Sequence, residues 1–190
     1  MKFYKIIFFT CLLLLAGACS SDDEPESVEN LFFPDLTEKG GVYFKDGSDE
    51  PFTGTILTEY SSGIPYVMAD FKDGQLHGRF YSWFMDGQIM GESHYKNGIR
   101  EGPWINWYPT GTVSQYVRYE DGMKQDTLIR WYKNGEKQVI AMFEDDQLHG
   151  KYFRMYPDGQ LWMYAEFEKN ERVSGITEWS RDGRSNRYIE

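Results

Sequence analysis

The stretch FKDGQLHGRFYSWFMDGQ at residues 71–88 returns as FEDDQLHGKYFRMYPDGQ at residues 143–160. The offset between the two copies is 72, which is three times 24, and steps of 24 from Phe71 reach four more aromatic residues: Tyr95, Tyr119, Phe143 and Phe167. In a chain with 17% aromatic residues, five in one phase is a coincidence on the order of one in ten thousand. The sequence therefore contains an internal repeat with a period of 24.

Other columns of the repeat follow the same period. We call the aromatic residue that opens each repeat, such as Phe71 or Tyr95, its aromatic starter. Midway through each period, the starter is followed by a second large side chain: Trp83, Trp107, Trp131, Met155 and Trp179. Counting backwards, Phe44 opens one further copy, with a three-residue insertion in its first turn. We therefore predict one repeat domain over residues 41–190, with six repeats that start near residues 44, 71, 95, 119, 143 and 167.

Each repeat holds two turn signals. The first follows the aromatic starter, as in KDG at 72–74, and the second ends on glycine, as in YPDG at 156–159. The second pattern favours a type I turn whose glycine takes a positive φ. Between turns the sequence alternates with period two, as in QLWMYAEF at 160–167, where Leu161, Met163, Ala165 and Phe167 share one side. This pattern predicts an all-β fold, a single-layer antiparallel β-meander solenoid of six 24-residue hairpin repeats.

A single layer must find its core among side chains that lie against their equivalents in the next repeat. We expect the two most regular columns to form this repeat core: Phe71, Tyr95, Tyr119, Phe143 and Phe167 with Trp83, Trp107, Trp131 and Trp179. By alternation, a less regular apolar set points to the other face and is the candidate binding face: Trp162, Tyr164, Tyr116, Met142, Tyr66 and Met68.

Two segments of the repeat region are similar to a known family. YKNGIREGPWINWYPTG (95–111) and FEDDQLHGKYFRMYPDG (143–159) resemble the MORN-type repeat, in the bacterial variant found in YwqK-family antitoxin-like proteins. The resemblance covers residues 44–190 and implies a β-hairpin repeat fold. Because MORN repeats elsewhere form non-enzymatic scaffolds, it also implies binding of proteins or membranes. The antitoxin label implies an alternative, toxin-neutralising role.

The N-terminus has the order of a secretory signal peptide. Two lysines precede an apolar run that is too short to span a bilayer, and small residues lead to Cys19. Ala16-Gly17-Ala18 before Cys19 resembles a lipobox, in which the cysteine is lipidated, although it also reads as an ordinary A-x-A cleavage site. We predict a signal peptide over residues 1–18 and a lipidated Cys19 with an acidic tether over 19–40, within which LFFPDL (31–36) packs onto the domain.

Charge and residue types exclude several classes of protein. Without Lys2 and Lys5 the basic side chains of the mature chain fall from 20 to 18 against 30 acidic ones, so it has no general attraction for nucleic acid. His77 and His149 occupy the same repeat position roughly 28 Å apart and cannot share a metal ion. Most carboxylates stand in turns, and no nucleophile motif occurs. We expect no enzyme activity, no metal site and no cofactor.

The sequence therefore predicts an outer-membrane lipoprotein, on the periplasmic side or the cell surface, that is held by its lipid and binds a protein partner of the envelope. A glycan-binding lipoprotein is the alternative, because the tryptophan column forms a ridge of flat rings on which a sugar can stack. The same column is also explained by packing alone.

Overall fold

A computed structural model of the chain describes residues 33–188. The predicted signal peptide, the predicted lipidation site Cys19 and most of the predicted tether lie outside the described residues. Every regular element in the described part is a β-strand. Among the described residues, no helix is long and apolar enough to cross a membrane.

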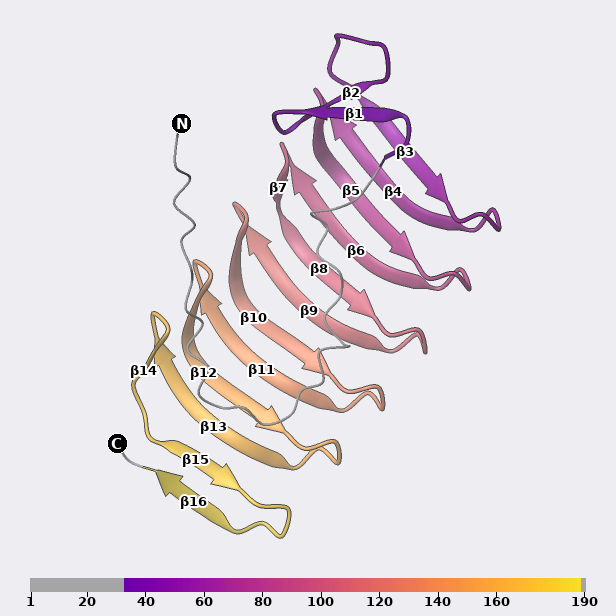
Figure 1. Cartoon of the computed structure of the whole chain (residues 1–190). Helices are drawn as coiled ribbons and strands as arrows, with labels where there is room; N and C mark the ends of the chain where they lie inside the picture. The colour runs from indigo at the N-terminus through magenta and orange to yellow at the C-terminus, as the bar shows by residue number, and fades with distance from the viewer. Residues whose placement is uncertain (1–32, 189–190) are drawn as a thin grey trace, which may run out of the picture. The chain divides into compact units, whose positions relative to one another are not determined.

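Most strands belong to one antiparallel sheet, in which neighbours in sequence are neighbours in space (Figure 1). Its main path consists of β3 (Gly54–Glu59), β4 (Pro65–Lys72), β5 (Gln75–Trp83), β6 (Ile89–Lys96), β8 (Gly102–Trp107), β9 (Val113–Glu120), β10 (Met123–Trp131), β11 (Lys137–Glu144), β12 (Gln147–Met155), β13 (Leu161–Glu168), β15 (Ile176–Trp179) and β16 (Ser185–Tyr188). The short strands β7 (Ile99–Arg100) and β14 (Glu171–Arg172) pair with β6 and β13. The predicted β-meander is confirmed.

The two turns of each repeat have different backbone geometry. In the second turn only the glycine has a positive φ, from 79° at Gly63 to 86° at Gly135, as the YPDG pattern predicts. The first turn places two successive residues in this region, for example Asn97 at 52° and Gly98 at 78°. Such a pair is typical of the type I′ hairpin turn, whose twist matches that of the strands.

Hydrogen bonds join neighbouring repeats at both margins of the sheet. At the first-turn margin, a backbone N–H reaches back to the preceding repeat, as from Gly98 to the carbonyl oxygen of Leu76 at 2.8 Å. At the other margin, the Tyr108 hydroxyl reaches forward to the carbonyl oxygen of Trp131 at 2.7 Å. Tyr60, Tyr132 and Tyr156 make the equivalent bond. The hairpins are therefore held together at their ends as well as along their strands.

One face of the sheet carries most of the buried side chains, and we call it the packed face. On it, large residues stand opposite small ones across the strands: Phe80 faces Ala69 and Ser93, and Tyr152 faces Ala141 and Ala165. The small residues leave room for rings to lie flat, which gives a single layer its core. Val67 and Val117 are each only 1% exposed.

The aromatic starters belong to this packed face. Phe71, Tyr95 and Tyr119 are buried, and Phe143 and Phe167 are half-buried. In the middle of the sheet, Val117, Tyr119 and Leu128 form a cluster against which Trp104, Val139 and Phe143 pack. The first of the two predicted core columns therefore lies on the packed face.

The beginning of the domain differs from the sequence-based boundary. Strands β1 (Leu36–Lys39) and β2 (Val42–Lys45) form a separate two-stranded sheet, so residues expected in the tether are folded. Phe33 is 3% exposed, with its ring 5.4 Å from that of Phe71, so this residue of the LFFPDL stretch packs onto the domain. The burial of these apolar side chains is the physical reason why the tether ends earlier than predicted.

The first repeat also departs from the others. Phe44, its predicted starter, lies in β2, forms an isolated bridge with Pro51 and pairs with Thr37 of β1. The inserted residues detach β2 from the main sheet, and Phe52 packs against Phe71 instead, with a ring separation of 5.7 Å. The hairpin β3–β4 is thus the first one in the main sheet.

Candidate interaction surface

The other face of the sheet carries a continuous row of side chains, in which each residue is paired with the next one across neighbouring strands. We call it the open row, and it runs from β3 to β15: Leu57, Met68, Tyr81, Glu92, Ile105, Tyr116, Ile129, Ile140, Phe153, Tyr164 and Thr177. Ten strand spacings give it a length of roughly 48 Å. Leu57 is exposed and the other members are half-buried.

The open row is apolar apart from Glu92 and Thr177. Its rings pack across strands, as Phe153 and Tyr164 do with centroids 5.1 Å apart. Such cross-strand pairs stabilise the sheet while leaving one side of each ring toward solvent. A partly exposed apolar surface of this extent is typical of a place where another molecule binds.

The candidate binding residues are only partly brought together. Met68, Tyr116 and Tyr164 belong to the open row, and Met142 lies beside it in β11, 40% exposed. Trp162 and Tyr66 do not belong to it. Their rings pack on Tyr156 and Tyr60 respectively, and the Arg154 guanidinium, from the packed face, lies over Trp162.

The cause of this difference is a β-bulge beside the second turn of these two hairpins. Arg154 is paired with Met163 and Met155 with Leu161, so Trp162 is an extra residue on its strand. The same shift occurs between Thr58 and Glu59, where Tyr66 is the extra residue. A bulge interrupts the alternation of side chains, which simple period-two reasoning does not take into account.

The tryptophan column also lies differently from the expected division into two faces. The rings of Tyr81 and Trp83 are 5.9 Å apart, and the two residues alternate with buried Ser82 on the packed face. By the same alternation, Trp107 follows buried Asn106, and Trp131 follows Arg130. The tryptophans therefore share the face of the open row and do not stack with the aromatic starters. All four are half-buried.

Several members of the open row were missed from the sequence. Tyr81, Ile105, Ile129 and Phe153 form one column at the spacing of the repeat, and Met68, Glu92, Tyr116, Ile140 and Tyr164 form a second. Tyr116 and Tyr164 therefore do recur. The signal was present in the repeat register, but Glu92 and the mixture of aliphatic and aromatic residues hide it.

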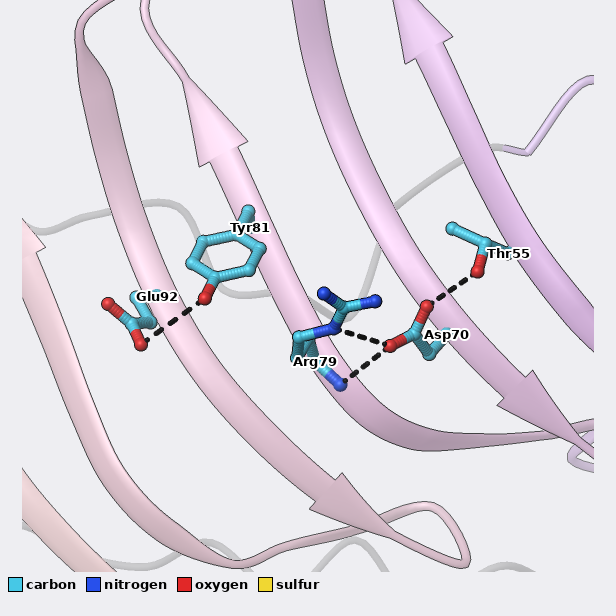
Figure 2. Close-up of polar contacts among 5 residues, drawn as sticks. All are labelled: Thr55, Asp70, Arg79, Tyr81 and Glu92. Atoms are coloured by element: carbon cyan, nitrogen blue, oxygen red, sulfur yellow. Dashed lines mark hydrogen bonds and ion pairs between the residues drawn. The ribbon is translucent and has the colours of Figure 1, made fainter.

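A polar network lies on the same face beside the open row (Figure 2). Asp70 accepts hydrogen bonds from the Thr55 hydroxyl at 2.7 Å and from Nε of Arg79 at 3.0 Å. Burial alone raises the pKa of Asp70, but these hydrogen bonds, a further one from the Arg79 backbone and the Arg79 charge outweigh it, so the pKa is held below its ordinary value. Next to this network, the Tyr81 hydroxyl donates to Glu92 at 3.5 Å.

His77 and His149 make local contacts. Nδ1 of His77 lies 3.0 Å from the side-chain oxygen of Asn97, and Nδ1 of His149 lies 3.5 Å from a carboxylate oxygen of Glu144. The residues that the structure describes contain no group of three or more His, Cys, Asp or Glu side chains placed to hold a metal ion.

Comparison with known families agrees with this repeat geometry. The family described as MORN repeat variant matches residues 76–97 and 100–121, which begin one repeat period apart and correspond to the hairpins β5–β6 and β8–β9. This chain is a MORN-type repeat protein. Its MORN-type repeats explain the regular pairing of large and small side chains, because each hairpin meets a copy of itself on either side. No curated protein matches the chain.

Proposed function

We propose that this MORN-type repeat protein is a non-enzymatic lipoprotein of the bacterial outer membrane, anchored through Cys19, that binds a protein partner along the open row. MORN repeats are generally found in scaffolds that bind proteins or membranes, which is compatible with this role. The observation that carries the proposal is the row itself, a largely apolar surface roughly 48 Å long that the fold leaves partly exposed.

The arrangement suits a partner with an extended, apolar contact surface. Aromatic and aliphatic side chains supply contact area at low cost in conformational entropy, since the sheet already holds them in place. Glu92 stands among them and gives the row one charged point, which orients a partner but adds little affinity by itself.

Substitutions that leave the strands intact test this proposal. Tyr116→Thr with Ile129→Thr places two polar, β-branched residues in the middle of the row. Proteins crosslinked to the chain in native envelopes are then compared between this variant, the wild type and Met85→Thr, a control in the second turn of its hairpin, where Met85 is 72% exposed. A partner that is lost only from the double variant supports the proposal. A partner captured equally by all three excludes the open row.

A glycan-binding role is a second candidate, and the position of the tryptophans favours it. Trp83, Trp107 and Trp131 share the face of the open row and recur every two strands, roughly 10 Å apart. A glycan array probed with the wild type and with Trp107→Leu distinguishes the two functions. A sugar ligand that depends on Trp107 would make the glycan the partner.

A further inference from the structure

The main sheet ends in two strands that pair on one side only. β3 and β16 lie at opposite ends of the sheet, with ten strands of the main path between them (Figure 1). In the described part of the chain, β3 pairs only with β4, and β16 pairs only with β15. The outer side of each strand therefore carries backbone N–H and C=O groups without a partner in the ladder. Such an edge is a template on which another strand can pair.

The two edges are complementary in strand type. Every hairpin of the main sheet has a first strand before its second turn and a second strand after it. The second strand of one hairpin pairs with the first strand of the next, as β4 does with β5 and β13 does with β15. β3 is a first strand without a preceding second strand, and β16 is a second strand without a following first strand. Each end thus offers the strand that the other end lacks.

The outer side of β3 has the geometry of an internal pairing site. The N–H of Tyr60 donates to the carbonyl oxygen of Ile64 inside the hairpin at 2.8 Å. Because successive N–H groups of a strand point to opposite sides, that of Leu57 points outward. In β8 the equivalent residue, Ile105, is half-buried and paired with Glu92 of the preceding hairpin. Leu57 lacks this neighbour and is 54% exposed.

The two ends of the sheet differ in charge. Residues 33–59, which lead to and include β3, hold six acidic and two basic side chains, whereas residues 176–188, which form the last hairpin, hold two acidic and three basic ones. The only charged residue of β3 is Glu59, and that of β16 is Arg187. A charge that only protects an edge from aggregation needs no opposite charge at the other end. Opposite signs favour the approach of unlike ends and oppose the approach of like ends.

We propose that this protein associates head to tail with a second copy of itself, by addition of β16 of one copy to β3 of the next. Arg187 is paired with Thr177, the last member of the open row. In the register that continues this row, Arg187 stands opposite Leu57 of the second copy, and Glu59 of that copy lies diagonally across from it. Opposite charges at such positions attract each other.

This contact has two consequences for the assembly. It joins the open rows of two copies end to end, and it does not rest on the partner protein proposed above. Because the two contact surfaces differ, a dimer keeps one unused β3 edge and one unused β16 edge, so association continues beyond the dimer.

Two variants, each blocked at one end, test the proposal by sedimentation velocity. The chain from Ser20 onward carries no lipid and contains every described residue. Leu57→Lys places a charge on the edge of β3, and Arg181→Glu with Arg187→Glu reverses the charge of the other end. Because β16 has only four residues, the contact belongs to the weak size class, and concentrations of about 10 to 500 μM are needed.

The mixture of the two variants is the decisive sample. We expect the wild type to exceed the mass of a dimer at the highest concentrations, and each variant alone to associate at least about tenfold more weakly. An equimolar mixture should form dimers and no larger species, because each variant keeps the end that the other has lost. Glu59→Lys blocks the β3 end through an exposed residue and replaces Leu57→Lys if that variant fails to fold.

Matched changes in the middle of the sheet are the controls. Met142→Lys, at a residue 40% exposed beside the open row, controls for Leu57→Lys, and Arg118→Glu with Lys151→Glu controls for the charge reversal. Both should associate like the wild type. The proposal is overturned by a wild type that stays monomeric, which would leave the edges to a strand of another protein, or by equal losses in the controls. Dimers of one blocked variant alone, or a mixture that stays monomeric, would also overturn it.

Discussion

The hydroxyl of Tyr108 donates a hydrogen bond to the carbonyl oxygen of Trp131, 2.7 Å away in the next repeat of the chain. Tyr60, Tyr132 and Tyr156 make the same bond, each to the equivalent carbonyl of the following repeat. The series has one interruption, because the equivalent residue of the second hairpin is Phe84, which has no hydroxyl. One of these hydrogen bonds between repeats is therefore missing because a single side chain, Phe84, differs.

This interruption gives a pair of opposite predictions. Tyr108→Phe should lower the free energy of unfolding by about 1 kcal/mol, since it leaves the Trp131 carbonyl without its donor. Phe84→Tyr should raise it by a similar amount, because the new hydroxyl can reach the carbonyl of Trp107. Urea unfolding measures both, with Tyr116→Phe on the open row as the control. If Phe84→Tyr is neutral, the hydroxyl bonds do not contribute net stability.

The tryptophans should differ in energy according to their position in the series. Trp107→Ala should cost about 2–3 kcal/mol, less than the ~3–5 of a fully buried aromatic, because this ring is half-buried. Trp179→Ala should cost less, since only β16 follows β15 in the sheet. Urea unfolding measures both changes. Equal losses of unfolding free energy in the two variants would argue against stability that comes from contacts between neighbouring repeats.

The Asp70 network predicts a dependence of stability on pH. The folded pKa of Asp70 lies below its ordinary value, so the ionised carboxylate stabilises the fold above about pH 4. This contribution disappears as the pH falls through the lower, folded pKa. Wild type should therefore exceed Asp70→Asn in melting temperature at pH 7, and the gap should narrow below about pH 4. Asp49→Asn is the exposed control, and a gap that stays constant with pH would contradict the assignment.

The anchor prediction concerns Cys19. If the cysteine is lipidated, the mature protein partitions into detergent, and Cys19→Ser releases it or leaves it unprocessed. Phase separation with a nonionic detergent and intact-mass spectrometry measure the two effects. A wild-type protein that stays in the aqueous phase with an unmodified Cys19 would show that Ala16-Gly17-Ala18 is an ordinary cleavage site.

The repeat period was enough to predict the hairpins, because the glycine of the second turn recurs at its place in every repeat, as Gly87 and Gly111 do. The faces were harder to predict. An extra residue beside a second turn, such as Trp162, moves a side chain out of the alternating series, and a bulge has no mark of its own in the sequence.

Because each strand pairs only with its neighbours in sequence, the length of the open row is set by the number of hairpins. Duplication of one repeat in the gene would lengthen the row by two strands, roughly 10 Å, and deletion would shorten it by as much. Neither event disturbs the contacts between the remaining hairpins. The length of the binding surface can therefore change in steps of one repeat. Duplication or deletion of a repeat would adapt the protein to a longer or shorter partner while the chemistry of the surface stays the same.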